Sequence, residues 1–268
     1  MLSVQSFFNL TDLMDRPLFQ DEDPPWQPLT KLKEYMDSYA YTQYIDGKKI
    51  IKDAIPLTQH VIIHEGKALY SDELNITFGD TTKGQLKVTR GSVELEGASV
   101  IMAGAVLIGD KISIGEGVLI ESGAMIKSPA IIGDFTEVRQ GAYLRGYCLT
   151  GKRCVLGHTT EIKHSIFLND AKAGHFAYIG DSILGNDTNL GAGTKFANLK
   201  FIPGNVSVRY EREPIDTGRR KLGAILADGC QTGCNSVTSP GTVMDKGAIL
   251  MPNTTAPGGY HKARALIR

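Results

Sequence analysis

The chain has 268 residues, which is enough for one large domain or two modest ones with a sizeable core. Its 29 Lys and Arg residues balance its 29 Asp and Glu residues, so no overall field would gather nucleic acid or an anionic membrane. The N-terminus has no basic region before an apolar one, and no stretch stays apolar for the roughly 18 residues that a membrane helix needs. We therefore expect a soluble cytoplasmic protein with no nucleic-acid or membrane partner.

Near the N-terminus an apolar row at helical spacing follows a stretch rich in Pro and acidic residues. Its members are Leu29, Leu32, Tyr35, Met36 and Tyr39. With Thr30 as the N-cap, this row predicts a helix, and we expect residues 1–40 to form a helical N-terminal cap. Residues 41–100 mix short β-type runs with turn residues, which indicates an irregular β segment leading into the next domain.

From about residue 100 onward an aliphatic residue returns at every sixth position. The first run of this register is Ile108, Ile114, Ile120, Ile126, Ile132, Val138 and Leu144, and after Thr150 it resumes at Leu156, Ile162 and Leu168. Neither the helical period of about 3.6 nor the strand period of 2 explains it. Hexapeptide solenoids do, because three short strands form one triangular coil and the aliphatic residue fills its interior.

This strict register resembles the left-handed parallel β-helix of hexapeptide-repeat proteins. The predicted fold class is therefore all-β, a left-handed β-helix over residues 101–255 with the helical N-terminal cap at its end. A loop insertion is expected at about 199–220, and residues 256–268 form a C-terminal tail. The four cysteines are too few and too irregularly spaced for a zinc ribbon or a disulfide framework, so we expect reduced thiols.

The register breaks beside a histidine. After Leu168 it reaches Gly174, next to His175, and then continues four residues out of step at Tyr178, Leu184, Leu190 and Phe196. A break in a regular solenoid predicts a loop, and loops on rigid scaffolds often carry functional sites. His175 is therefore a candidate for chemistry, although a structural or merely exposed histidine is the ordinary alternative.

The segment from Lys172 to Asn198, K-A-G-H-F-A-Y-I-G-D-S-I-L-G-N-D-T-N-L-G-A-G-T-K-F-A-N, resembles a known signature. It is similar to the acetyltransferase domain of bifunctional N-acetylglucosamine-1-phosphate uridyltransferases, and F-T-E-V-R-Q-G and E-I-K-H-S fit the same family. The motif G-R-R-K-L-G-A resembles a loop of the shorter sugar-phosphate acetyltransferase domains. The resemblance covers roughly residues 100 to 255. The glycine-rich nucleotide loop of a uridyltransferase domain is missing.

The resemblance implies acetyl transfer from acetyl-CoA to the amine of glucosamine-1-phosphate or a related amino-sugar phosphate or nucleotide, a step towards UDP-N-acetylglucosamine. An ammonium cannot attack a thioester, so the reaction needs a neutral base beside the amine, and a histidine, with an ordinary pKa of about 6.5, suits this role. His175 matches the base of the family. Asn198 matches an asparagine that donates to developing charge or orients the nucleophile.

The same resemblance assigns the binding residues. Those expected at the substrate are Arg139, Lys163, Tyr178 and Lys221 at its phosphate and Asn189 at its sugar. Arg219 and Arg220, in a compact basic turn, are expected at the phosphates of the substrate or of acetyl-CoA, and Cys234 is expected at acetyl-CoA. The ordinary alternatives are solvated surface charges, an exposed basic turn and, for Asn189, a turn or ladder asparagine.

The chain departs from the family at Lys195, Phe196 and Leu199, near the expected thioester. The resemblance also implies a homotrimer, because the family's CoA groove lies between subunits. Two alternatives stay open. One is a non-catalytic solenoid that binds a sugar nucleotide. The other is a hydrase of the carbonic anhydrase type with zinc on His158, His164 and His175, although the first two are six residues apart and should face different sides.

Overall fold

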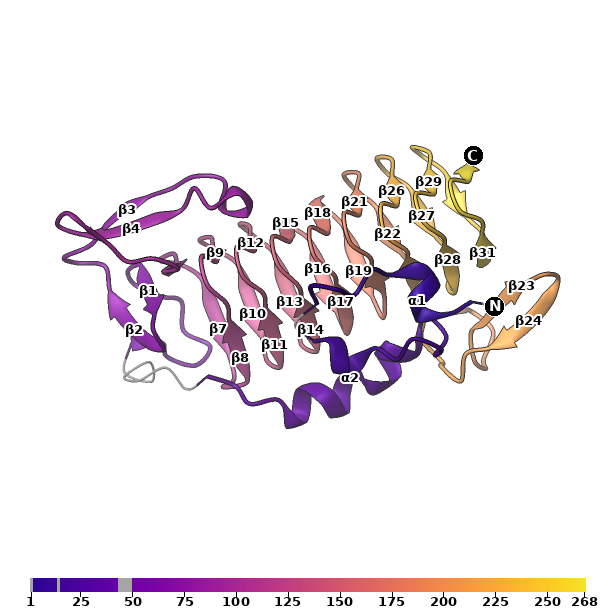
Figure 1. Ribbon diagram of the computed structural model, residues 1–268, viewed down its shortest axis with the longest axis horizontal. Coiled ribbons are helices and arrows are strands. Elements are labelled where there is room, and N and C mark those ends of the chain that lie inside the picture. The colour runs from indigo at the N-terminus through magenta and orange to yellow at the C-terminus, as the bar shows by residue number, and fades with distance from the viewer. Residues whose placement is uncertain (1, 14, 43–49) are drawn as a thin grey trace.

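The computed structural model describes residues 2–13, 15–42 and 50–268, and the dominant feature of this part of the chain is a stack of triangular coils. Figure 1 shows the coils in a row, from β7 at one end to β31 at the other. Each coil adds one strand to each of three sheets, and from β6 onward all neighbouring strands of these sheets are parallel. The expected fold class, an all-β left-handed parallel β-helix, is confirmed.

The three sheets follow one another along each coil. The first sheet contains β1 (Val61–His64), β2 (Lys67–Tyr70), β6 (Ser99–Ile101), β9 (Leu119–Ile120), β12 (Glu137–Val138), β15 (Val155–His158), β18 (Lys172–His175), β21 (Asn189–Leu190), β26 (Gln231–Thr232), β29 (Ile249–Leu250) and β32 (Leu266–Ile267). The second contains β7 (Val106–Ile108), β10 (Met125–Lys127), β13 (Tyr143–Arg145), β16 (Glu161–Lys163), β19 (Tyr178–Gly180), β22 (Lys195–Phe196), β27 (Val237–Thr238) and β30 (Thr255–Ala256). The third contains β8 (Ile112–Ile114), β11 (Ala130–Ile132), β14 (Cys148–Thr150), β17 (Ser165–Phe167), β20 (Ile183–Leu184), β25 (Ala224–Leu226), β28 (Thr242–Met244) and β31 (Gly259–His261).

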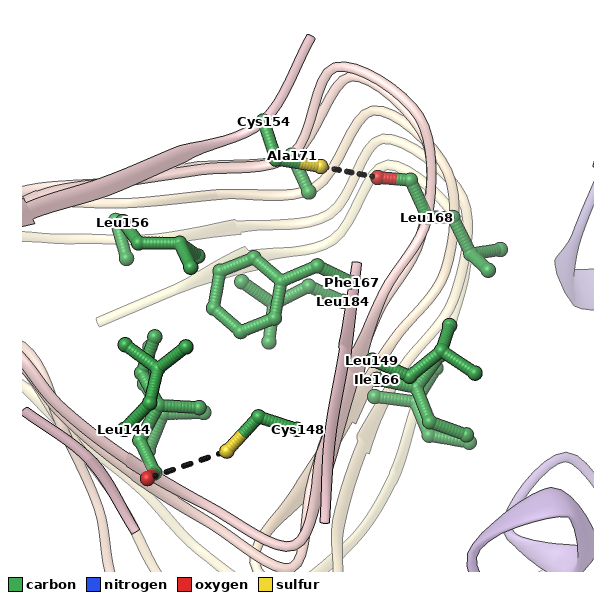
Figure 2. Close-up of a cluster of buried hydrophobic side chains, with 14 of the residues drawn as sticks. Leu144, Cys148, Leu149, Cys154, Leu156, Ile166, Phe167, Leu168, Ala171 and Leu184 are labelled. Atoms are coloured by element: carbon green, nitrogen blue, oxygen red, sulfur yellow. Dashed lines mark hydrogen bonds between the residues drawn. The ribbon is translucent and has the colours of Figure 1, made fainter. Parts of the chain in front are cut away.

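Residues that point into the coils form aligned rows. In the second sheet, Ile126, Leu144, Ile162, Ile179 and Phe196 are paired in register and at most 1% exposed. Figure 2 shows the interior of the middle coils, where Phe167 lies among leucines and the thiols of Cys148 and Cys154 bond to backbone carbonyls. Burial raises the pKa of both thiols to about 12, so they stay protonated.

The register break at His175 has a different form from the predicted loop. The inward residues of successive second-sheet strands are 18 apart from Leu144 to Ile162 but 17 apart from Ile162 to Ile179 and from there to Phe196. Each shortened coil loses its residue at the corner between the second and third sheets, where His164 and Asp181 have positive φ. The chain around His175 stays in β18, and no loop leaves the solenoid there.

The third sheet is apolar on both faces, and the N-terminal helices cover its outer face. Its outward residues include Leu149, Ile166, Ile183 and Ile225, all at 0% exposure. They share one core with the buried side chains of α1 (Val4–Phe7) and α2 (Gln27–Ser38). In the described part of the chain, two short 3-10 turns, η1 (Arg16–Leu18) and η2 (Thr81–Lys83), are also present.

The predicted helical cap is therefore present but lies along the side of the coils. Hydrogen bonds tie Phe7 and Asn9 to Asp228, Asp12 to Asn169, and Asp37 to Tyr147. Figure 1 shows α2 running alongside the coils. This position follows from the third sheet, whose outer face is also apolar and needs a cover along its length. The helix also begins at Gln27, so Thr30 lies inside it and is not the N-cap.

Strands β1 and β2 continue the first sheet in antiparallel fashion at the start of the solenoid. The small sheet of β3 (Asn75–Thr77), β4 (Lys87–Arg90) and β5 (Val93–Glu94) packs beside them, with Leu86 and Val88 against Val100 and Leu119. At the other end, the predicted tail at residues 256–268 is wrong, because β31 and β32 pair with β28 and β29 and complete another coil. None of the described helices is both long and apolar enough to cross a membrane.

Candidate functional site

His175 is exposed at the end of β18, at the corner between the first and second sheets. It is paired in register with His158, the last residue of β15 on the preceding coil. Between them projects Phe176, which is 53% exposed and contacts the His158 ring edge to face, with the ring centroids 5.2 Å apart. The His158 Nδ1 atom lies 3.0 Å from the Gln140 carbonyl and therefore donates to it. His175 is thus presented to solvent from a rigid corner.

Arg139 lies close to the strand that carries His175. A Cβ atom on Gly174 would lie 3.9 Å from its Nη1 atom, and its Nη2 atom pairs with the Glu137 carboxylate at 3.0 Å. The Arg139 side chain remains 33% exposed. The structure therefore places this predicted phosphate residue beside the residue that precedes the predicted base, and Glu137 already balances its charge.

Tyr178 and Asn198 meet on the second sheet, one coil apart. A Cβ atom at Gly180 would lie 2.6 Å from Asn198 Nδ2 and 2.8 Å from the Tyr178 hydroxyl, so both polar groups lie over this glycine. Burial raises the pKa of Tyr178, and a hydrogen bond from the Asn198 amide opposes this effect. Tyr178 follows His175 by three residues, so the corner and this pair belong to one surface region.

Two other predicted residues lie on either side of this region. Lys163 ends β16 and is paired in register with Gly180, so it flanks the Tyr178 and Asn198 pair. Asn189 is exposed on β21 of the first sheet, in register with Lys172. It therefore lies around the corner from Tyr178, on the face that Gly174 and Arg139 share.

The predicted insertion leaves the solenoid between the second and third sheets. Its neck is held by a bridge between Leu199 and Lys221 and by a hydrogen bond from the Leu222 amide to the Asn198 carbonyl. Beyond the neck, β23 (Ser207–Tyr210) and β24 (Glu213–Asp216) form an antiparallel hairpin. Figure 1 shows this hairpin beside the C-terminal coils. Lys221 is exposed at the neck.

Arg219, expected at a phosphate, is instead nearly buried. Its side chain is 14% exposed, and its Nη2 atom lies 3.4 Å from the Asp181 carboxylate while Nη1 reaches Thr30 of α2. Burial lowers the pKa of Arg219, and the attraction of Asp181 partly offsets this effect. An internal carboxylate therefore faces the Arg219 guanidinium in this structure, and its contact with a ligand phosphate stays a prediction. Arg220 is exposed and has no such partner among the described residues.

Cys234 and Lys195 lie near the same corner as His175. Cys234 is exposed and follows Gln231 of β26 by three residues, just as His175 follows Lys172 of β18 by three. Because β26 and β18 both belong to the first sheet, Cys234 and His175 lie near the same corner of their coils. Lys195 is paired in register with Tyr178, and its ammonium donates to the Gly193 carbonyl at 2.8 Å. The departure at Lys195 therefore places a cation beside the Tyr178 position.

Sequence reasoning missed two acidic residues of this region. Glu161 is in register with Tyr178 and pairs with Arg145 at 2.7 Å. Asp181 lies under Asn198, the residue before the neck, and its Oδ2 atom accepts a hydrogen bond of 2.7 Å from the Asn198 side-chain amide. Both residues belong to segments on which the family resemblance rests. For Asp181, the 17 residues that separate it from Asn198 are the one signal in the sequence that could have placed the two on adjacent coils.

The zinc alternative needs three converging histidines. His158 and His175 stack at one corner, whereas His164 lies at another and pairs with Asp181 at 3.1 Å. Within the described ranges, no group of three or more His, Cys, Asp or Glu side chains is placed to hold a metal ion.

The structure thus combines a parallel β-helix with a histidine at a corner and a tyrosine and an asparagine side by side on the next sheet. No family model matches the chain. It is 37% identical over 111 residues to a bifunctional sugar-1-phosphate nucleotidylyltransferase/acetyltransferase of Sulfurisphaera tokodaii, covering 41% of this chain and 28% of that protein. It is 36% identical over 100 residues to the bifunctional protein GlmU of Methanocaldococcus jannaschii, covering 37% of this chain and 24% of that protein.

These relatives confirm the resemblance to the bifunctional enzymes. The chain spans only about a quarter of their length. Among solved structures, a mutant of perosamine N-acetyltransferase from Caulobacter crescentus, in complex with CoA and GDP-perosamine, is 26% identical, with 36% of this chain and 47% of that chain covered. The TM-score of 0.31 is too low to support a structural argument.

Proposed function

We propose that this chain is an acetyl-CoA-dependent N-acetyltransferase that acts on the amine of glucosamine-1-phosphate or a related amino-sugar phosphate or nucleotide. The observation that carries the proposal is the exposed His175 at a rigid corner, three residues before a tyrosine whose hydroxyl lies against the Asn198 amide. The acetyltransferase named among the activities of the first relative supports the reaction class.

The proposed reaction is a direct transfer. The amine nitrogen attacks the thioester carbonyl carbon, and the carbon–sulfur bond breaks as the new carbon–nitrogen bond forms. His175 accepts the proton that the nitrogen loses, and that proton passes to the departing CoA thiolate. Because neutral imidazole is the active form, a histidine suits this step near neutral pH.

Lys163 and Arg139 supply the positive charge that a sugar phosphate requires. Both flank the corner that carries His175 and the Tyr178–Asn198 pair. Charged hydrogen bonds to a phosphate dianion are stronger than neutral ones. Arg220 and Cys234 remain the proposed contacts for CoA because both are exposed.

The decisive assay measures release of free thiol from acetyl-CoA with a panel of amino-sugar phosphates and nucleotides. We predict that His175→Ala lowers kcat by about 10² to 10⁴, the usual contribution of a positioned base. The matched control is His64→Ala, which removes a partly exposed histidine that ends β1, far along the chain from His175. Equal activity of wild type and His175→Ala would reject the base.

Two other results would change the function itself. Sugar-nucleotide binding without thiol release by the wild type would favour the non-catalytic solenoid. Stoichiometric zinc in the purified protein, with carbon dioxide hydration, would favour the hydrase.

A further inference from the structure

A buried charged cluster lies directly beneath the Tyr178–Asn198 pair. At its centre is Asp181, whose side chain is 7% exposed and accepts hydrogen bonds on both oxygens. Asn198 Nδ2 donates to Oδ2 at 2.7 Å, and His164 Nδ1 lies 3.1 Å from Oδ1. Arg219 Nη2 lies 3.4 Å from the same Oδ1. The cluster joins two coils, the neck of the insertion and helix α2.

Asp181 is ionised in this environment. Burial alone would raise the pKa of its carboxyl, but the hydrogen bond and charge of His164, with help from Asn198 and Lys163, hold that pKa below its usual range. An ionised carboxylate only accepts hydrogen bonds. His164 must therefore carry a proton on Nδ1, and the 3.5 Å approach of Arg219 to that atom is a contact between two donors.

The same argument fixes the direction of the Asn198 amide. Its oxygen cannot face a carboxylate, so Nδ2 faces Asp181. The Tyr178 hydroxyl lies beside the same nitrogen over Gly180. With Nδ2 turned to Asp181, Oδ1 faces away from that carboxylate, and among the described residues no donor is bonded to it. Asn198 offers an acceptor for a ligand.

We infer that Asp181 is a positioning residue that holds Asn198 with its nitrogen inward, so that Asn198 Oδ1 accepts a hydrogen bond from the substrate amine. This inference rests on the proposed function and refines it. Of the two roles considered for Asn198, orientation of the nucleophile is selected over donation to the developing oxyanion. With one amine hydrogen bonded to Asn198 and another to the base, the nitrogen lone pair is aimed at the thioester.

The first test is Asp181→Asn, which keeps the size of the side chain but lets the Asn198 amide turn. We expect kcat to fall about 10- to 100-fold, the effect of a misoriented reacting group, with KM for acetyl-CoA nearly unchanged. In an Asn198→Ala background the same substitution should change kcat no further. The matched control is Asp170→Asn, which removes another corner ion pair, to Arg153 at 2.7 Å, and should leave kcat unchanged.

The second test exchanges the two residues. Asn198→Asp alone sets two carboxylates against each other and should abolish turnover. The double variant Asp181→Asn with Asn198→Asp restores a donor–acceptor pair and still presents an oxygen outward. We expect it to recover at least tenfold in kcat over Asn198→Asp, because only the acceptor role survives the exchange.

The outcomes separate the inference from the function. Equal losses of kcat from Asp181→Asn in both backgrounds, or from Asp170→Asn, would overturn it as a general structural effect. An exchange variant that folds, as judged by its unfolding temperature, but gains nothing over Asn198→Asp would also overturn it. A wild type without turnover on any amino sugar would reject the proposed function and, with it, this inference.

Discussion

Gly180 shows how one missing side chain makes room for the site. A Cβ atom there would overlap Asn198 Nδ2 and the Tyr178 hydroxyl, both at the ends of movable side chains. We therefore predict that Gly180→Ala keeps the fold but displaces both groups and lowers kcat about 10- to 100-fold in the thiol-release assay.

Gly185→Ala is the opposite case, because its Cβ would lie 2.6 Å from the backbone carbonyl carbon of Ala227. This variant should lower the unfolding temperature while the folded fraction keeps its kcat. A large loss of stability in Gly180→Ala, with normal kcat, would contradict the placement of Asn198 over Gly180.

At the same scale, the family resemblance assigned His175, Arg139, Tyr178 and Asn198 to one site, and the structure places them on one surface region. It could not locate Arg219. The path of the insertion back to the coil depends on the neck at Leu199 and Lys221, and no local pattern encodes that contact. A basic residue in a loop therefore suggested a ligand, whereas Asp181 already supplied its partner.

At the scale of elements, the six-residue rhythm predicted the coils but in some of them assigned the wrong residue to the interior. Ile108, Leu168 and Tyr178 fit the rhythm, yet Leu107, Phe167 and Ile179 point inward. In each case an apolar residue stands next to the true anchor, so hydrophobicity alone cannot select between them. The corners at His164 and Asp181 are one residue shorter, and both residues have positive φ, which the spacing of apolar residues does not predict.

The helices along the third sheet should contribute directly to the stability of the solenoid. Leu32 in α2 is 0% exposed and lies in the same core as the outward face of that sheet. We predict that Leu32→Ala lowers the free energy of unfolding by about 2–5 kcal/mol in denaturant titration. The control Leu266→Ala, at a side chain 45% exposed, should cost less than about 0.5 kcal/mol. Equal effects would mean that α2 packs only loosely.

At the scale of the whole molecule, the insertion exposes apolar residues in a way that a lone chain would not favour. Phe201 is fully exposed and Ile202 is 77% exposed, and Leu199 at the neck is 48% exposed. Leu199 follows Asn198 directly, and Phe201 and Ile202 come within the next three residues. A second copy of the chain over this segment would bury them beside the proposed substrate.

Because the family resemblance implies a homotrimer, we predict three subunits with this segment at the contact between them. Analytical ultracentrifugation should give about three times the chain mass of 29.1 kDa. Replacing both Phe201 and Ile202 by Asp should dissociate the trimer, because charged side chains at an apolar interface lose hydration without gaining a partner. Val93→Asp, at another exposed apolar residue on β5, should leave the assembly intact. A monomeric wild type would contradict the prediction, and a trimer that withstands the double substitution would place the contact elsewhere.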